Sequence, residues 1–278
     1  MSAACWRWRT ALRSAKLNVM TEHLRWLVRP QLRDPLLVLA FEGWNDAGES
    51  ASTAARYLAA QTGAAPLAEI DGEEFFDFTV RRPMIRIEEG VVEHLEWPTC
   101  RFLYAAAGDA QELVIGTAIE PHLHWRLYTE QILAIVNELG IRRAVLLGAY
   151  LADVLYSRPV EITAVASHAD LIDRHALEPT RYEGPTGIVG LIGYELRMRG
   201  VETLALWAGL PHYINVSPNP RGALALLERA APLIDVKLDL EPLAASAREC
   251  EQRMSQMVSA DPELAEYVRE LKRREFAQ

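Results

Sequence analysis

The chain has 278 residues, half of them hydrophobic, and a formal net charge of −9 at pH 7. It is long enough to bury a sizeable core in one large domain or two small ones. A nucleic-acid-binding protein needs a surface of basic side chains to pair with backbone phosphates. The net negative charge of this chain therefore excludes a general nucleic-acid binder. No apolar run of about 18 residues is present, so no membrane partner is expected.

The first part of the chain differs in charge from the rest. Residues 1–33 carry seven basic side chains against one acid and lack the apolar segment of a secretory signal. We expect a basic, disordered extension here, with residues 1–19 dispensable for folding. Three cysteines without short spacing indicate a reducing compartment, so a cytoplasmic location is expected.

From residue 34 onward, strand-like and helix-like segments alternate. Apolar runs at 36–41, 101–107, 143–150 and 203–208 are typical of strands buried in a sheet. Helices are expected at 47–61, 123–139, 187–200 and 219–231. The aromatic-rich stretch 70–97 is expected to add strands or a hairpin. This alternation predicts an α/β domain over residues 34–239, with a mostly parallel sheet and helices on both faces.

The pattern changes after residue 239, where two charged helices are expected at 241–258 and 262–275 without a strand between them. They indicate a helical appendage over residues 240–278. Leu264, Tyr267, Val268 and Leu271 form an apolar stripe at helical spacing, and such a stripe must cover something. Together with aromatic residues in predicted loops, the stripe predicts a homo-oligomer with closed symmetry.

The segment F-E-G-W-N-D-A-G-E-S at residues 41–50 has the glycine spacing of a phosphate-binding loop. Such a loop needs lysine where this chain has Glu49, so an anion would be repelled. Ser50 lies too far past the strand for a hydrolase nucleophile. The acids favour a capping box instead. In this arrangement the Asp46 carboxylate accepts hydrogen bonds from the first N–H groups of the helix, and the Glu49 side chain accepts one from the backbone at the cap.

Five segments in order resemble the proteasome assembly chaperone family, in the branch of its second member and of the bacterial, actinobacterial type. They are F-E-G-W-N-D-A-G at 41–48, H-W-R-L-Y-T-E-Q-I-L at 124–133, L-L-G-A-Y-L-A-D-V at 146–154 with S-R-P-V at 157–160, Y-E-G-P-T-G-I-V-G-L-I at 182–192, and W-A-G-L-P-H-Y-I at 207–214. The resemblance implies a three-layer α/β/α sandwich related to nucleoside phosphorylases. It also implies oligomers and proteasome-related partners.

Loops that follow parallel strands gather at one edge of a sheet, where ligands bind. This rule and the family segments predict a binding region, while the alternative is that its glycines and prolines only shape turns. The candidates are Gly43, Trp44, Asn45, Asp46, Asp153, Arg158, Glu183, Gly184, Pro185, Thr186, Gly187, Pro211, His212 and Tyr213. Free N–H groups after Thr186 could hold an anion, with Arg158 and Arg181 adding charge.

No catalytic motif is complete, and no cofactor or metal is predicted. His212 could act as a base, but a structural hydrogen bond is favoured. His122 and His124 cannot share a helix face, and no third ligand follows them.

The chain departs from the family pattern at two places. Leu155 and Tyr156 stand where relatives tend to have Pro-His. The C-terminal docking tail of some relatives carries a tyrosine where this chain has Ala277.

Two functions remain open. One is a protein-binding, assembly-chaperone-like protein, which the resemblance and the lack of a catalytic motif favour. The other is a small-molecule enzyme on a nucleoside-phosphorylase-like scaffold, which glycine-rich loops at strand ends would suit, although fold kinship says little about chemistry.

Overall fold

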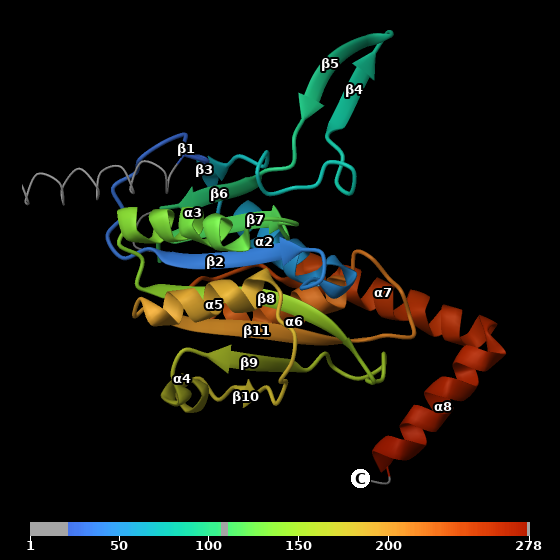
Figure 1. The fold of residues 1–278 in the computed structure, drawn as a ribbon. Coiled ribbons are helices and arrows are strands. Elements are labelled where there is room, and N and C mark those ends of the chain that lie inside the picture. The colour runs from blue at the N-terminus through green and yellow to red at the C-terminus, as the bar shows by residue number, and fades with distance from the viewer. Residues whose placement is uncertain (1–21, 107–110, 277–278) are drawn as a thin grey trace, which may run out of the picture.

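The computed structural model describes residues 22–106 and 111–276. Within them, a nine-stranded sheet runs in the order β1-β3-β6-β7-β2-β8-β11-β9-β10 (Figure 1). Its strands are β1 (Leu24–Trp26), β2 (Leu36–Glu42), β3 (Ala65–Ile70), β6 (Cys100–Ala105), β7 (Leu113–Ile119), β8 (Arg143–Ala152), β9 (Ile162–Ala166), β10 (Glu178–Pro179) and β11 (Glu202–Pro211). The helices are α2 (Ser50–Gln61), α3 (Trp125–Glu138), α4 (Ala169–Arg174), α5 (Ile188–Met198), α6 (Pro220–Ala230), α7 (Glu241–Ala260) and α8 (Pro262–Phe276), with a 3-10 turn, η1, at Ala47–Glu49.

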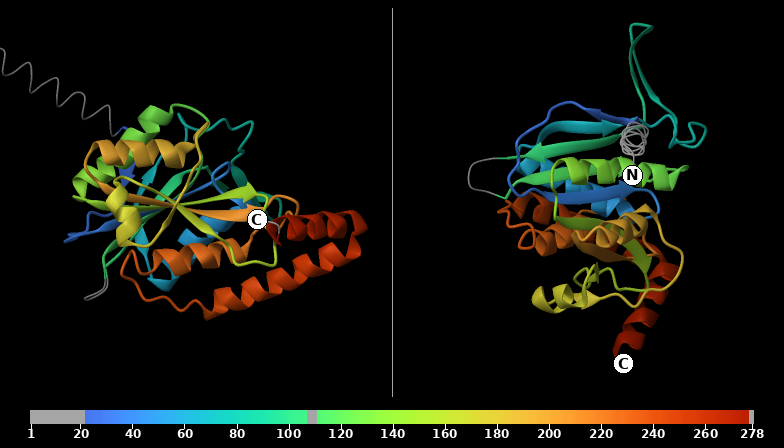
Figure 2. Two further views of the ribbon diagram at one scale, coloured as in Figure 1. Left: turned by 90° about the horizontal axis from the view of Figure 1, so that it is seen from below. Right: turned by 60° about the vertical axis from the view of Figure 1, so that its left-hand side comes forward.

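The centre of the sheet is parallel: β2 lies between β7 and β8, and β11 follows β8 in the same direction. Helices α3 and α5 cover one face, and α2 and α6 cover the other (Figures 1 and 2). Side chains of β2 alternate between the two faces of the sheet. Leu37 and Leu39 pack on the side of α3 and α5, and Leu36 and Val38 pack on the side of α2 and α6. A strand buried on both faces reads as a continuous apolar run. The predicted α/β/α sandwich is confirmed.

The sheet extends further than the sequence predicted. Strand β7 was not expected, yet it lies in the parallel centre beside β2. Strand β1 pairs antiparallel with β3, and Leu24 is buried in the core. Residues 24–26 therefore belong to the sheet and not to a disordered extension, while residues 1–19 lie outside the described part.

The stretch 70–97 forms the expected hairpin, made of β4 (Met84–Glu88) and β5 (Val91–Glu96) in a separate two-stranded sheet. It projects away from the body of the molecule (Figures 1 and 2). Every residue of both strands is exposed. We call β4 and β5 with their connecting turn the hairpin arm.

Helices α7 and α8 form the expected appendage, and α8 folds back toward the sheet (Figure 1). The stripe on α8 packs against residues of the same chain, including Leu155, Tyr156 and Ile214. Val268 and Leu271 are only 4% and 6% exposed. The expectation that this stripe supplies surface for self-association is therefore wrong. Across the described residues, no helix is both long and apolar enough to cross a membrane.

Candidate functional site

The loops that follow the central strands meet at one end of the sheet, as the sequence predicted (Figure 1). The carbonyl of Asn45, after β2, accepts from the Ala149 N–H on β8 at 2.8 Å. The N–H of His212, after β11, donates to the Ala152 carbonyl on β8 at 3.2 Å. We call this region, made of residues 43–49, 120–124, 150–159 and 210–216, the carboxyl edge.

The Glu120 carboxylate joins two of the predicted segments. Its Oε1 accepts from Asn45 Nδ2 at 2.7 Å and from the Ile188 N–H, at the start of α5, at 2.8 Å. An acid at the positive end of a helix is stabilising. Asn45 is fully buried, and a Cβ on Gly187 would lie 2.3 Å from its Oδ1. Only glycine lets α5 approach this closely.

Glu120 places a negative charge at the start of α5, where the sequence analysis expected an anion to bind. The Ile188 N–H, which was expected to be free for an anion, already donates to Glu120. Thr186 does not cap the helix, because its hydroxyl points to the Gly187 carbonyl at 3.4 Å. The sequence prediction missed Glu120, although an acid directly after strand β7 fits the rule that located the other loops.

Asp46 caps α2, as predicted, although it lies four residues before the helix begins. Its Oδ1 accepts from the Ala51 N–H at 2.6 Å, and its Oδ2 from the Ser52 N–H at 3.3 Å. The side chain is 5% exposed, and this burial raises the pKa of Asp46. Glu49 does not reach back as a capping box requires. It accepts from the Ser217 hydroxyl at 2.6 Å instead.

The glycine-spaced loop is closed over by its own chain. The Asn219 N–H donates to the Gly48 carbonyl at 2.7 Å. A Cβ on Gly48 would lie 2.9 Å from the Val216 carbonyl oxygen. The space that a phosphate would need is therefore occupied by residues 216–219.

A second polar cluster links the carboxyl edge to α8. His212 Nε2 lies 2.7 Å from Asp153 Oδ1 and 3.0 Å from the Tyr267 hydroxyl, which also donates to Asp153 at 3.0 Å. The Tyr267 hydroxyl and then His212 lower the pKa of Asp153. Tyr213 packs edge-on against both rings and donates its hydroxyl to the Val154 carbonyl at 3.0 Å. His212 thus has the structural hydrogen bonds that the sequence analysis favoured.

The other candidates do not converge on one point. Arg158 faces Glu275 at 3.4 Å. Glu183, Gly184 and Pro185 lie in an exposed loop. The Tyr182 hydroxyl donates to the Pro185 carbonyl at 2.8 Å across this loop. Pro211 is buried at the end of β11, and Trp44 is 62% exposed.

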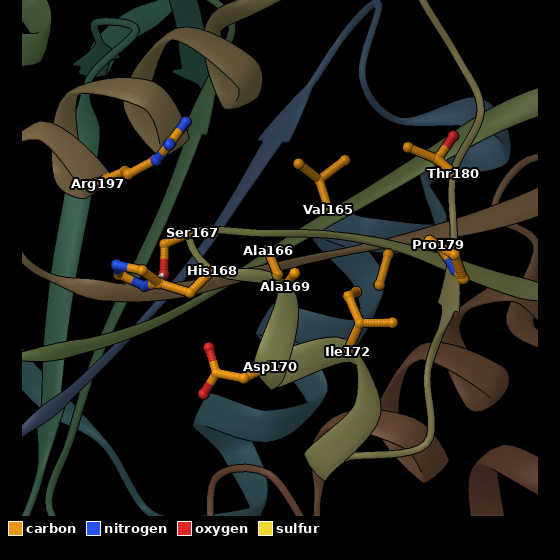
Figure 3. Close-up of a pocket in the computed structure, with 11 residues that line it drawn as sticks. Val165, Ala166, Ser167, His168, Ala169, Asp170, Ile172, Pro179, Thr180 and Arg197 are labelled. Carbon is orange, nitrogen blue, oxygen red and sulfur yellow. Dashed lines mark hydrogen bonds between the residues drawn. The ribbon is translucent and has the colours of Figure 1, made fainter.

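A shallow hollow of about 670 Å³ lies beside β9 and α4, away from these residues (Figure 3). Six apolar residues line it together with five polar ones, which are Ser167, His168, Asp170, Thr180 and Arg197. The Ser167 hydroxyl accepts from the Thr203 N–H at 3.1 Å, so part of its polar lining serves the fold. No candidate from the sequence lines it. Across the described residues, no group of three or more His, Cys, Asp or Glu side chains could hold a metal ion.

Comparison with known proteins gives the family. The profile of the PAC2 family matches residues 40–258, and a search of curated proteins found no match. Among solved structures, a PAC2 family protein from Streptomyces avermitilis is 43% identical, covering 84% of this chain and 100% of that one, with a TM-score of 0.78. A proteasome-assembly chaperone homologue from Mycobacterium tuberculosis is 39% identical, covering 84% and 99%, with a TM-score of 0.77.

A more distant structure shares the fold. An archaeal proteasome activator from Pyrococcus furiosus is 21% identical, covering 84% of this chain and 97% of that one, with a TM-score of 0.70. The matched segments include the carboxyl-edge loops described above, since the profile runs from β2 to α7. The chain belongs to the PAC2 family.

Proposed function

We propose that this protein is a cytoplasmic, homo-oligomeric protein-binding factor that acts like an assembly chaperone on proteasome-related proteins. The observation that carries the proposal is the 39% identity to a proteasome-assembly chaperone homologue over 99% of that chain. The comparisons name no enzyme among the relatives described above, and the alternative of a small-molecule enzyme is not supported.

The chemistry of the carboxyl edge favours a protein partner over a small anion. Several of its polar groups are engaged within the chain, since Glu120 accepts from Asn45 Nδ2 and from the start of α5, and Asp153 pairs with His212, whereas the buried Asn45 Oδ1 has no partner among the described residues. Apolar side chains stay exposed at the ends of the same strands. Trp44 is 62% exposed after β2, and Leu151 is 61% exposed in β8. Exposed aromatic and aliphatic groups of this kind are what protein interfaces prefer at their centres.

The test is binding of proteasome α and β subunits from the organism that encodes this chain, measured by biolayer interferometry. The variant Trp44→Ala/Leu151→Ala removes the apolar groups at the carboxyl edge. Met257→Ala, an exposed apolar residue on α7, is the matched control. We expect the double variant to bind about tenfold more weakly or worse, as hot-spot aromatic residues do, and the control to bind like the wild type.

Two results would count against the proposal in different ways. No binding of either subunit by the wild-type protein would remove the proteasome-related role. Binding that Trp44→Ala/Leu151→Ala and Met257→Ala leave equally strong would keep that role but move the contact away from the carboxyl edge.

A further inference from the structure

The outer edge of β9 is only partly covered. Strand β9 pairs antiparallel with β11 on its inner side, where the Ser167 N–H donates to the Thr203 carbonyl at 2.8 Å. Successive residues of an antiparallel pair alternate between bonding to the neighbour and pointing away from it. The backbone N–H and carbonyl groups of Ala164 and Ala166 therefore point to the outer edge. There the Ala164 carbonyl accepts from the Thr180 N–H at 3.0 Å.

The cover of β9 stops before Ala166. Strand β10 has two residues and pairs only with Thr163 and Ala164. The chain then leaves the sheet, and the Tyr182 N–H donates to the Thr180 hydroxyl at 3.2 Å and not to β9. Within residues 22–106 and 111–276, the N–H and carbonyl of Ala166 have no backbone partner. An open strand edge of this kind can accept another extended segment.

The hollow of about 670 Å³ lies along this open edge. Val165 and Arg197 of α5 lie on one side of β9, and Asp170 and Ile172 of α4 lie on the other (Figure 3). Val165 is 47% exposed, so its apolar side chain has room for a contact. Successive side chains of a strand point to opposite faces. An added strand would therefore place alternate side chains on Val165 and Arg197, and the others on Ile172.

The lining of the hollow favours an acidic group at one end. Arg197 has no ion-pair partner in the part of the chain that the structure describes. The acid of the lining, Asp170, pairs with Arg174 at 2.6 Å. The Ser167 hydroxyl already accepts from the backbone, so its own hydrogen can go to His168 Nδ1 at 3.0 Å. A neutral His168 then carries its hydrogen on Nε2 and adds a second donor beside the arginine.

We propose that the open edge of β9 binds an extended segment of a partner protein as an added strand, with apolar side chains on Val165 and Ile172 and an acidic side chain at Arg197. This goes beyond the proposed function, because the hollow lies away from the carboxyl edge. Backbone hydrogen bonds to Ala166 hold the segment, and the side chains on either face select it. Alternation places the acid two residues from the apolar residue on Val165.

The first test uses three capped, fluorescein-labelled pentapeptides. Glu-Ile-Val-Ile-Glu has the same order in both directions, so it suits a parallel or an antiparallel strand. The second peptide has lysine in place of both glutamates, and the third carries N-methyl groups on its three central amides. Fluorescence anisotropy measures binding to the full-length protein. We expect saturable binding of the first peptide. The others should bind at least about tenfold more weakly, because one loses the ion pair with Arg197 and the other the backbone hydrogen bonds.

Three variants of the protein locate the binding site. Arg197→Glu should reverse the preference, so that the lysine peptide binds better than the glutamate peptide. Arg126→Glu reverses an exposed arginine on α3 and should keep the wild-type preference. Ala166→Pro removes the outward N–H but none of the hydrogen bonds to β11, as proline on an edge strand can. It should weaken binding of the glutamate peptide at least about tenfold. Thermal melts check that each variant is folded.

Four results would overturn the inference. Equal binding of the N-methylated peptide would exclude an added strand. A glutamate preference that survives Arg197→Glu would exclude the contact with the acid. No saturable binding of the glutamate peptide below about 1 mM would exclude the site. A lower mass of the unliganded protein in Ala166→Pro, by light scattering, would assign the edge to a second copy. None of these results bears on proteasome-subunit binding, which Trp44→Ala/Leu151→Ala tests separately.

Discussion

At the residue scale, the Glu120 carboxylate joins β7, the loop after β2 and the start of α5. It accepts two hydrogen bonds, from Asn45 and from the Ile188 N–H. We expect Glu120→Ala to lower the free energy of unfolding by about 1–3 kcal/mol, because two largely buried donors lose their acceptor. Chemical denaturation measures the loss.

Two further variants show whether the acceptor is what matters. Glu120→Gln keeps an oxygen at this position and should recover part of the lost stability. Glu228→Ala removes an exposed acid from α6 and should change stability by no more than about 0.5 kcal/mol. A Glu120→Ala protein as stable as Glu228→Ala would show that the two hydrogen bonds contribute nothing to the fold.

Asp46 combines a stabilising cap with the cost of burying a charge. Removing the cap in Asp46→Ala should lower the free energy of unfolding by about 0.5–2 kcal/mol.

The pH dependence of stability is a sharper test of the environment of Asp46. Burial raises the pKa of Asp46 above its ordinary value of 3.8, against the opposing effect of its hydrogen bonds. The folded state then holds this proton more tightly than the unfolded state does.

The contribution of this raised pKa is fully present below pH 3.8 and is lost as the pH rises through the folded pKa. The wild type should therefore lose stability relative to Asp46→Asn, which cannot ionise, as the pH rises from below 3.8 toward neutrality. Urea unfolding of both proteins across this range measures the difference. A difference that moves in the wild type's favour would mean that the N–H groups outweigh burial and lower the pKa of Asp46.

At the element scale, α8 is attached by its apolar stripe and by Tyr267. Leu271 is buried against the other residues of the C-terminal cluster. Leu271→Asp places a charge there and should cost at least about 2 kcal/mol of local stability. Hydrogen exchange should accelerate in α8 while the central strands stay protected.

Lys272→Asp is the control for this experiment, because it introduces the same residue at the next, exposed position. It should leave exchange in α8 close to that of the wild type. If Leu271→Asp lowered the mass of an oligomer without changing exchange in α8, the stripe would be an interface between copies after all.

Which elements the sequence could predict follows from how they are packed. Strands β2 and β8 are buried over most of their length, and each contains an apolar run of four or more residues, at 36–41 and 144–147. Strand β7 was not predicted because Gly116 and Thr117 limit its apolar run to three residues, 113–115. A Cβ on Gly116 would lie 2.4 Å from Leu39 and 2.8 Å from Phe102. The residue that breaks the pattern is thus the one that lets neighbouring side chains pack, which a single sequence does not reveal.

The candidate site shows the same limit. The convergence of loops at the carboxyl edge follows from strand direction alone, so it could be predicted. The partners within it could not, because Asp153 and Tyr267 are 114 residues apart in the chain. Likewise, the stripe on α8 predicted that something is covered, but not that the covered residues are Leu155 and Tyr156. Amphipathic patterns identify a buried face without identifying its partner.

At the scale of the whole molecule, the hairpin arm adjoins the carboxyl edge. Arg81 at the base of the hairpin arm contacts Glu42, directly before the carboxyl-edge loop.

The proposed binding of proteasome subunits is tested most directly by native mass spectrometry of this protein mixed with separately purified proteasome α subunits. The proposal predicts peaks whose masses combine the two proteins, and it predicts that these peaks fall sharply with Trp44→Ala/Leu151→Ala but not with Met257→Ala. Spectra that contain only the separate proteins, at concentrations where each is folded and stable, would contradict it.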